Sequence, residues 1–569
     1  MGKGGIRLSE KKGANGLKGT STVRVDAGIF GVKTIEKGSP VSDALPRSVE
    51  GRPVLAAILN NMAVPLETPV ICDASAEPLT IVSERGAAAY RDSICFLAAK
   101  AATTLFPERK FRVHSALGSA LWCTLDPVSE NPGGDAAALE KEVKSCISRK
   151  ATIRTFAKSY AEAVDIFRRG NRTDELNLLS HRNPPVVFLS ECEEFYALNQ
   201  TPLVSDTGCL GKFAISAYHD GFVLRVPDSS SPDGLSPLPE SGNPVPIYES
   251  SAKKASLMDV ETIGDLNRVI IENRFPEYVR TVEAFQTKNL SRIADAAAAR
   301  SPRVRLVLLA GPSSSGKTTT AHRLCTQLRV NGLRPMILST DDYFVGDARN
   351  PRDENGNLDY ETVEAVDRDR LADDLNALFE GKSVRLRKFD FNEHDGFEDS
   401  RETVLPPEGV VVLEGIHALN PVLTAGIDDS VKFGIYVNAF TQLAVDSCNR
   451  ISARDARLLR RMVRDAKYRG MPALETLAMW PSVYRGEKKW IYPFGSRADA
   501  VFDSGLDYEL AVLKTFAVPL LDQVKPWHRE FVTARKLSGL LHNVVAAPAD
   551  AVPGDSILRE SIGGSQLSY

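Results

Sequence analysis

The residues best suited to chemistry begin with the run GPSSSGKT at positions 311–318, here called the phosphate loop, which fits the pattern GxxxxGK[ST]. Glycines let such a loop curl until its backbone N–H groups and the next helix N-terminus surround phosphate oxygens. Lys317 is expected to neutralise phosphate charge and Thr318 to face a magnesium ion. An apolar run precedes the loop and a helix-like stretch follows it, which favours a nucleotide site over an ordinary turn. The residues assigned to nucleotide binding here are Gly311, Pro312, Ser313, Ser314, Ser315, Gly316, Lys317, Thr318 and Thr319.

Two carboxylate positions supply what phosphoryl transfer to an alcohol also needs, a metal-side acid and a group that accepts or orients the hydroxyl proton. Glu414 follows the apolar run VVVL, and ligands gather at the carboxyl ends of parallel strands, so we assign it to the metal. The alternative is a surface carboxylate that caps a strand. Asp341 and Asp342 follow another short apolar run. Because strand-end aspartates often cap helices or form turns, one is expected to be structural, and we favour Asp341 as the base.

Seven arginines lie between residues 450 and 469, and four of them share one face of a predicted helix. Guanidinium groups on a helical lid can close over a nucleotide and stabilise charge on the transferring phosphoryl group. The alternative is a solvated basic face, partly paired with Asp455 and Asp465. The phosphate loop upstream favours the lid. The four arginines are Arg457, Arg460, Arg461 and Arg464.

The 569 residues exceed the size of one hydrophobic core, so several domains are expected. With 43% apolar and 25% charged residues the chain is not disordered overall, and a net charge of -3 gives no argument for bulk attraction to nucleic acid or membranes. Eight cysteines form no CxxC pair, so a reducing compartment is expected. We find neither a signal peptide nor an apolar stretch of membrane-spanning length, and predict a cytoplasmic protein without membrane contact.

Composition shifts predict the organisation of the chain. Strands and helices alternate from about residue 303, which indicates an α/β domain with a mostly parallel sheet and flanking helices. The stretch FRVHSALGSALWCTL at 111–125 is predicted to be a helix that leads into a strand. The predicted parts are a flexible arm at 1–21, a small sheet module at 22–85, an α+β domain at 86–250, a helical connector at 251–300, the α/β domain at 301–530, and a C-terminal tail at 531–569. The end of this tail, from about residue 546, is expected to lie over the surface.

Residues 303 to about 525 resemble the uridine kinase and phosphoribulokinase branch of P-loop kinases. The resemblance rests jointly on GPSSSGKTT, LSTDDYF, KFDFNEH, VVLEGIHALNP and RLLRRMVRD. It implies an ATP- and Mg²⁺-dependent phosphotransferase with Asp341 as catalytic base and Glu414 as the magnesium-side acid. It also implies that Arg461, Arg464 and Arg469 are phosphate and substrate arginines.

The acceptor pocket matches that family less closely. Uridine kinases carry Phe-Asp where this chain has Tyr360-Glu361, and a tyrosine where it has Phe389. His394 falls at the family's base-contacting histidine, although a surface loop histidine is the alternative. The leading acceptor is the 5'-hydroxyl of uridine or cytidine. Because a lost hydroxyl at Phe389 removes a polar handle on a pyrimidine, a sugar phosphate, a polyol or another small alcohol is the alternative.

The N-terminal half resembles the TGS and editing modules of threonyl-tRNA synthetase, which accompany long uridine kinase-like proteins. The matching stretches include YRDSICFLAAKAATTLFPERKFRVHSALG and FYALNQTPLVSDTGCLGKFAI. Positions that would carry two histidines in the synthetase read Asp92 and Cys95 here, so neither hydrolysis nor metal binding is expected. A binding, regulatory or assembly role remains, and we expect a homo-oligomer. An RNA-associated nucleotide switch is a further alternative, supported only by a short basic arm at the N-terminus.

Overall fold

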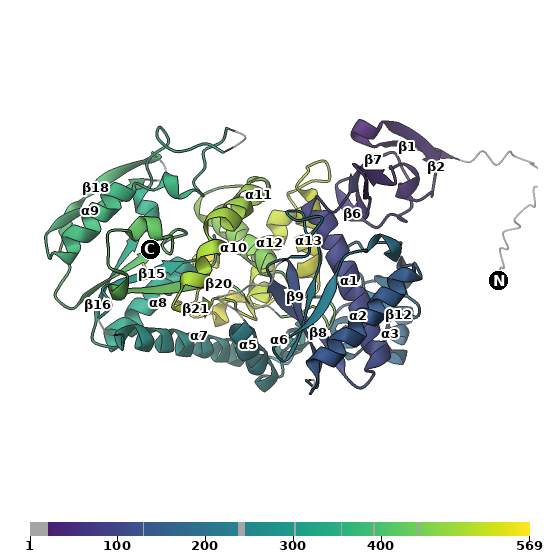
Figure 1. Ribbon diagram of the computed structural model, residues 1–569, viewed down its shortest axis with the longest axis horizontal. Coiled ribbons are helices and arrows are strands. Elements are labelled where there is room, and N and C mark those ends of the chain that lie inside the picture. Colours follow the sequence, from purple (N-terminus) through teal and green to yellow (C-terminus); the bar gives the residue numbers. More distant parts are fainter. Residues whose placement is uncertain are drawn as a thin grey trace, which may run out of the picture.

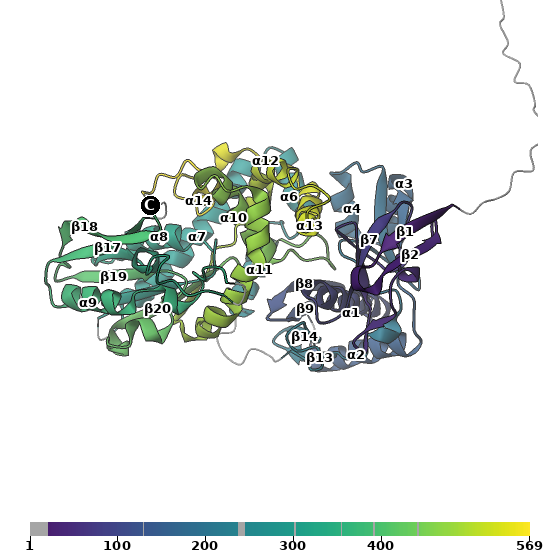
Figure 2. The same cartoon turned by 90° about the horizontal axis from the view of Figure 1, so that it is seen from above.

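The chain forms two ends joined by a central group of helices (Figures 1 and 2). The computed structural model describes residues 21–128, 130–236, 245–300, 303–353, 356–390, 393–440 and 443–568. Apart from residue 21, the predicted flexible arm lies outside the described residues. The central helices are α10 (Ala453–Tyr468), α11 (Ala473–Trp490), α12 (Glu509–Leu521) and α13 (Phe531–His542).

The N-terminal module is a five-stranded sheet in the order β2-β1-β7-β5-β6, with β1 and β7 parallel and the other neighbours antiparallel. Strand β1 alternates exposed and buried residues, so Val23 and Val25 enter the core. Asn61 after β5 donates a hydrogen bond to the carbonyl of Pro526 at 2.9 Å, which ties the module to the central helices. The strands are β1 (Thr22–Asp26), β2 (Val32–Glu36), β5 (Ala56–Leu59), β6 (Met62–Val64) and β7 (Ala74–Leu79).

The next domain is mixed α/β, as predicted. Its longest helix begins after Ser83, whose hydroxyl accepts a hydrogen bond from the backbone N–H of Gly86. Helices α1 and α2 pack on a sheet in the order β13-β14-β9-β8, and a second sheet, β10-β11-β12, lies beside α3 and α4. The elements are α1 (Glu84–Leu105), β8 (Lys110–Leu117), β9 (Ala120–Asp126), α2 (Pro132–Ser148), β10 (Arg154–Ser159), α3 (Tyr160–Arg169), α4 (Thr173–Ser180), β11 (Val186–Cys192), β12 (Phe195–Leu198), β13 (Ala214–Tyr218) and β14 (Gly221–Arg225).

The prediction of a helix at the start of residues 111–125 was wrong. This stretch is an antiparallel hairpin of β8 and β9 that turns at Gly118, whose φ is +64°. Phe111 and Val113 are both buried and lie two positions apart, which is the period of a strand. The small residues between Ser115 and Ala120 hid that alternation.

The C-terminal half is built on a wholly parallel sheet in the order β16-β19-β15-β20-β21. Every residue of β15 and β19 is buried, because helices cover both faces of such a sheet. The prediction of an α/β domain with a mostly parallel sheet is therefore confirmed. The strands are β15 (Leu306–Ala310), β16 (Arg334–Ser339), β19 (Gly409–Glu414), β20 (Lys432–Asn438) and β21 (Ala500–Asp503).

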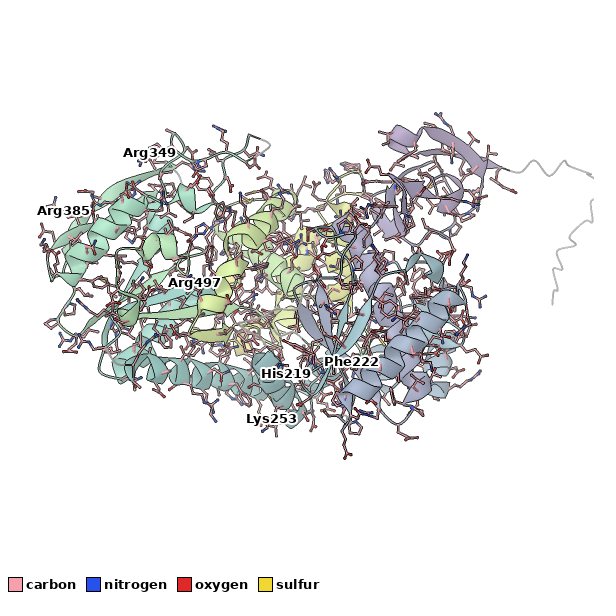
Figure 3. The ribbon with its side chains drawn as sticks, in the orientation of Figure 1. His219, Phe222, Lys253, Arg349, Arg385 and Arg497 are labelled. Carbon is pink, nitrogen blue, oxygen red and sulfur yellow. The ribbon has the colours of Figure 1, made fainter. Side chains whose placement is uncertain are left out.

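Helices α7 and α8 pack together beneath this sheet, and α7 runs along one side of the molecule from its centre (Figure 1). The hairpin of β17 and β18 forms the outer edge of this end, where Arg385 and Arg349 project away from the centre (Figure 3). The elements are α5 (Val245–Leu257), α6 (Ile263–Ile271), α7 (Phe275–Ala298), α8 (Lys317–Val330), α9 (Arg368–Phe379), β17 (Val384–Asp390) and β18 (Asp395–Thr403).

From the sequence we expected the end of the C-terminal tail to lie over the surface. In the structure, part of it is buried instead. After α13 the chain returns to the C-terminal half and ends in the short helix α14 (Arg559–Ile562). Ile557, Leu558 and Ile562 are at most 4% exposed and belong to the core formed around the parallel sheet. The proline- and glycine-containing residues before them form the turns that bring these apolar side chains inward.

Candidate active site

The phosphate loop connects β15 to α8 at the carboxyl edge of the parallel sheet. Gly316 precedes α8 in the left-handed region, with φ of +80°. A side chain at Gly311 would place its Cβ 2.0 Å from the carbonyl oxygen of Val437, so only glycine allows β20 to approach this closely. The loop therefore has the strand, turn and helix context that a phosphate cradle requires.

Thr318 and Glu414, the two residues assigned to a metal, lie side by side. The register pairs Glu414 with Leu309 on one side and Ser339 on the other, which fixes it at the sheet's carboxyl edge. The hydroxyls of Thr318 and Ser339 donate to Glu414 Oε1 at 3.3 and 3.1 Å. Burial raises the pKa of the Glu414 carboxyl, and the nearby Asp341 raises it further.

The two neighbouring aspartates have different surroundings. Asp342 forms an ion pair of 2.7 Å with Lys388 on β17, which gives it a structural role. Asp341 lies in the short 3-10 turn after β16, where burial raises its pKa, while the positive charge of Lys317 opposes the rise. Arg464 and Arg469 also act on Asp341 electrostatically. Of the pair, Asp341 is thus the carboxyl group whose pKa responds to the charges of the loop lysine and the arginines.

The four arginines on α10 do not form one lid face, which corrects that expectation. Arg457 makes a bidentate ion pair with Glu487, with N–O distances of 2.6 and 2.8 Å, and Arg460 pairs with Glu509 at 2.5 Å. Both arginine side chains are 2% exposed, so these pairs lock α10 to α11 and α12. The solvated basic face considered as the alternative is also absent from this part of α10.

Arg461 and Arg464 have the positions expected of phosphate-binding arginines. Arg461 donates to the hydroxyl of Ser313 in the phosphate loop at 2.8 Å. The fully buried carboxylate of Asp465 lies within 3.5 Å of the guanidinium groups of Arg461, Arg464 and Arg469. One acid therefore holds three arginines beside the loop, with net positive charge left over for a phosphate group.

Known proteins are similar to the part of the chain that carries the phosphate loop, Glu414 and the arginines of α10. The sequence model of the Phosphoribulokinase / Uridine kinase family matches residues 306–511. These residues form a domain of that family. The chain is therefore an ATP-dependent phosphotransferase. The match leaves the N-terminal half aside, so its resemblance to synthetase modules stays a prediction.

Curated relatives and solved structures cover the same portion of the chain. The uridine kinase of Lactobacillus helveticus is 28% identical over 213 residues, which are 36% of this chain and 90% of the relative. A uridine kinase of Schizosaccharomyces pombe is 28% identical over 37% of this chain and 42% of its own length. The structure of a possible uridine kinase from Bacillus stearothermophilus is 21% identical, with a TM-score of 0.27, and covers 38% of this chain and 98% of that one.

The predicted acceptor residues of the kinase domain separate into a buried group and a rim. Glu361 lies against α11, where a side chain on Gly486 would come within 2.4 Å of its Cβ. Burial raises the pKa of Glu361 to about 7, opposed by the charges of Arg461 and Lys317. Glu361 therefore shares the electrostatic environment of the phosphate loop and lies close to the groups that would handle phosphate.

The aromatic residues of this region pack on one another. The rings of Tyr360 and Phe389 both meet Phe344 edge to face, with centroids 5.3 and 5.7 Å apart, and Phe389 is 7% exposed. Phe389 thus belongs to the core of the kinase domain. The hydroxyl of Tyr360 donates to Asp347, and His394 Nδ1 lies 3.7 Å from the same carboxylate. With a 56% exposed side chain, His394 lies at the rim.

The sequence analysis missed Glu487, which anchors the phosphate loop. Its Oε1 accepts a hydrogen bond from the backbone N–H of Ser313 at 3.2 Å, and its Oε2 accepts one from the hydroxyl of Tyr492 at 2.8 Å. Burial alone would raise the pKa of Glu487, but the adjacent Arg457 holds it below its usual value. A single acid in the basic run GEKKW has the pattern of an exposed helix, so the sequence held no local signal for the burial of Glu487.

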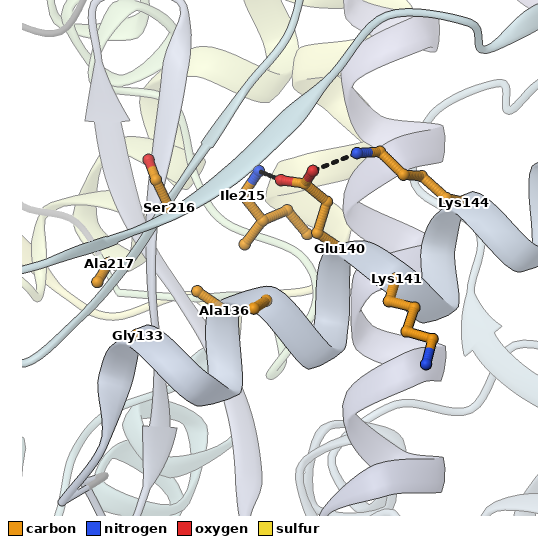
Figure 4. Close-up of a pocket in the computed structure, with 9 residues that line it drawn as sticks. Gly133, Ala136, Glu140, Lys141, Lys144, Ile215, Ser216 and Ala217 are labelled. Carbon is orange, nitrogen blue, oxygen red and sulfur yellow. Dashed lines mark hydrogen bonds and ion pairs between the residues drawn. The ribbon is translucent and has the colours of Figure 1, made fainter.

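A pocket lies in the N-terminal half of the chain, away from the kinase domain. It has a volume of about 440 Å³ and lies between α2 and β13 (Figure 4). Glu140 at its wall accepts a hydrogen bond from the backbone N–H of Ile215 and pairs with Lys144, so its charge is already satisfied. We find no group there that is positioned for chemistry.

A second cluster with the composition of a metal site lies between the two halves. The ligand atoms of Glu175, Asp446 and Cys448 lie within 4.8 Å of one another. The guanidinium of Arg172 already donates to Glu175 and, at 3.3 Å, to the sulfur of Cys448. An arginine therefore supplies the positive charge that a metal ion would bring. Among the described residues, no helix is both long enough and apolar enough to cross a membrane.

Proposed function

We propose that this phosphotransferase transfers the γ-phosphoryl group of Mg²⁺-ATP to the 5'-hydroxyl of uridine or cytidine. The observation that carries the proposal is the convergence of three groups at the carboxyl edge of the parallel sheet. These are the phosphate loop with Lys317, the Thr318 and Glu414 pair, and Asp341. In this proposal they serve as the phosphate cradle, the metal-side acid and the base of phosphoryl transfer.

The residues near Glu414 fit a magnesium ion. Two hydroxyls, each within 3.3 Å of the same Glu414 carboxylate oxygen, offer with it the oxygen donors that Mg²⁺ prefers. The raised pKa of Glu414 shows that its buried negative charge lacks full compensation, which a cation would provide. A bound Mg²⁺ would neutralise the charge between the terminal phosphates. Thr318 and Glu414 would hold it directly or through water.

The chain's own residues account for the other roles. Lys317 and the loop N–H groups bind phosphate oxygens, and Arg461 and Arg464 stabilise charge on the phosphoryl group in transit. Asp341 orients the acceptor hydroxyl and takes its proton, because its raised pKa brings it closer to the pKa that proton transfer needs. Such catalysis depends mostly on positioning and electrostatics.

The choice of uridine or cytidine as acceptor is supported by the relatives and by two residues of the kinase domain. Relatives over this region are named uridine kinases, and we assign Glu361 and His394 to contacts with the acceptor. A sugar phosphate, a polyol or another small alcohol is the second candidate. It is favoured by Phe389, which is packed against Phe344 and has no hydroxyl with which to read a base.

A panel of acceptors tests the proposal. Purified protein would be incubated with [γ-³²P]ATP, Mg²⁺ and one of uridine, cytidine, ribulose 5-phosphate, glycerate or pantothenate, and the labelled product would be identified. We expect label in the 5'-monophosphate of uridine or cytidine. Label in another alcohol would support the second candidate. ATP hydrolysis that is stimulated by RNA and by none of these alcohols would favour the nucleotide switch.

The N-terminal half is proposed to act as a binding or assembly module of a cytoplasmic homo-oligomer. Contacts between the halves support a coupled arrangement. Arg454 on α10 pairs with Glu84 at 2.8 Å, and Arg85 on α1 donates to the hydroxyl of Thr533 on α13 at 3.1 Å. Light scattering of the intact chain tests the oligomer. A monomeric mass across the concentration range would contradict it.

A further inference from the structure

The C-terminal tail touches the phosphate loop directly. A side chain added to Gly316 would place its Cβ 2.4 Å from Cγ2 of Ile557, so this isoleucine packs against the last glycine of the loop. Ile557 is 2% exposed and Leu558 is fully buried. These residues lie some 45 positions beyond residue 511, where the family match ends. The tail segment, residues 556–563, therefore adds a wall to the site that the family domain does not supply.

Glu560 in this segment joins the loop helix to an arginine. Its Oε2 accepts a hydrogen bond from the hydroxyl of Thr319 at 3.1 Å, and its Oε1 lies 3.4 Å from Nη1 of Arg464. The Glu560 and Arg464 side chains are 16% and 19% exposed, so the contact is largely shielded from water. Glu560 also acts electrostatically on Glu414. A single carboxylate thus reaches the nucleotide helix, the arginine and the metal-side acid.

The segment is held in place from both ends. The guanidinium of Arg559 donates to the carbonyl oxygens of Val552 and Gly563 at 2.5 and 3.1 Å, which closes the turn around it. The hydroxyls of Ser556 and Tyr508 lie 3.2 Å apart, and Tyr508 donates to Glu283 on α7 at 2.6 Å. The position of Glu560 is therefore fixed by the fold.

A fixed carboxylate is useful here because arginine is flexible. A free arginine side chain loses rotamer entropy when it is ordered. A contact that orders Arg464 in advance removes that cost from phosphate binding and from the transition state. The negative charge of Glu560 by itself would repel phosphate, so any benefit must come through the position of Arg464.

We propose that Glu560 is a positioning residue for Arg464, and that the tail segment is an integral part of the nucleotide site. The proposal depends on phosphoryl transfer from ATP but not on the identity of the acceptor. It assigns to the end of the chain a role in catalysis that the matched domain alone would not have.

A double-mutant cycle tests the proposal, with the variants Glu560→Ala, Arg464→Ala and their combination in the full chain. The acceptor is whichever alcohol the wild-type protein phosphorylates. We expect Glu560→Ala to lower kcat about tenfold, equivalent to about 1.4 kcal/mol, and the double variant to be no slower than Arg464→Ala. Such non-additivity would not follow from a purely structural role. Asp555→Ala, an exposed acid just before the segment, is the matched control and should retain wild-type kcat.

Losses that multiply in the double variant, or a Glu560→Ala variant with wild-type kcat, would overturn the proposal. If Glu560→Ala does not fold, Glu560→Gln replaces it in the same cycle. A readout that needs no acceptor separates this proposal from that of the acceptor. Binding of Mg²⁺ and a non-hydrolysable ATP analogue should slow hydrogen exchange of amides 556–563 in the wild type, and less so in Arg464→Ala. Unchanged exchange on nucleotide binding would equally contradict the proposal.

Discussion

Glu487 on α11 accepts a hydrogen bond from the backbone N–H of Ser313 at 3.2 Å, and the same carboxylate forms a bidentate pair with Arg457. A buried ion pair thus connects the phosphate loop to α11, which carries Glu487, and to α10, which carries Arg457, Arg461 and Arg464. Glu487 is fully buried and Arg457 is 1% exposed. Positive charge at Arg457 therefore has no access to water and depends on its partner.

Replacement of Glu487 by glutamine should destabilise the whole protein. The change leaves the Arg457 charge buried without a counter-ion, which typically costs about 3–5 kcal/mol. We expect a loss of this size in the free energy of unfolding of the cooperative unit that contains α10, measured by urea denaturation. Glu475→Gln, at an exposed position on the first turn of the same helix, should change it by less than about 1 kcal/mol. Equal effects of the two changes would contradict the assigned role of the pair.

Replacement of Lys317 by alanine should affect turnover far more than stability. The ammonium group is assigned to phosphate oxygens, and it donates a hydrogen bond to the carbonyl of Pro312 at 3.2 Å. We expect kcat to fall at least about a hundredfold, while the melting temperature changes by only a few degrees. Steady-state kinetics and thermal unfolding measure the two effects. Near-wild-type turnover would show that the loop has been wrongly assigned.

The Glu414 carboxylate should determine the magnesium requirement. Glu414→Gln keeps the hydrogen-bonding shape but removes the charge that would hold a cation. We expect the Mg²⁺ concentration for half-maximal activity to rise about tenfold or more, in line with the loss of an ion contact worth about 1.4 kcal/mol. Glu408→Gln lies just before the same strand, is 57% exposed, and serves as the control. An unchanged Mg²⁺ titration for Glu414→Gln would exclude this ligand.

The buried Glu361 carboxyl should make stability depend on pH. Its Oε2 is buried without a hydrogen-bond partner among the described residues, and its pKa is raised from 4.5 to about 7. The folded state thus holds this proton more tightly than the unfolded state does. The resulting stabilisation is fully present below pH 4.5 and is lost as the pH rises through 7.

Relative to Glu361→Gln, we therefore expect the wild-type free energy of unfolding to fall by on the order of 2 kcal/mol between pH 4.5 and 8. Urea unfolding at a series of pH values measures this difference. Glu364→Gln, at an exposed position nearby, should show a much smaller change relative to the wild type. A wild-type protein that gains stability over this range relative to Glu361→Gln would reverse the sign and refute the assignment.

The sequence was sufficient to predict the parts of the site whose signal is local. The phosphate loop and the strands before Asp341 and Glu414 are continuous in the chain, and parallel strands bring their ends together. The roles of the arginines were not predictable in this way. Arg457 and Arg461 are four residues apart on the same helix, and only the position of Glu487, thirty residues on from Arg457, makes one structural and the other a loop contact.

The tail segment and the β8–β9 hairpin are two further features that the sequence did not predict. Glu560 meets Thr319 across 241 residues, and nothing in the short run around it indicates where it will pack. At 110–126 small residues masked the strand period, and propensity alone favoured a helix. The contact of Glu560 was missed because it is long-range, and the β8–β9 hairpin was missed because its strand periodicity is weak.

The most direct test of this account compares the wild type with Asp341→Asn in two measurements on the same preparations. One is the affinity for Mg²⁺ and a non-hydrolysable ATP analogue, and the other is the transfer of labelled phosphate to uridine. The account predicts that Asp341→Asn binds the nucleotide with affinity similar to the wild type but transfers phosphate at least about a hundredfold more slowly. Wild-type transfer by Asp341→Asn, or a wild-type protein that binds no Mg²⁺-nucleotide, would contradict it.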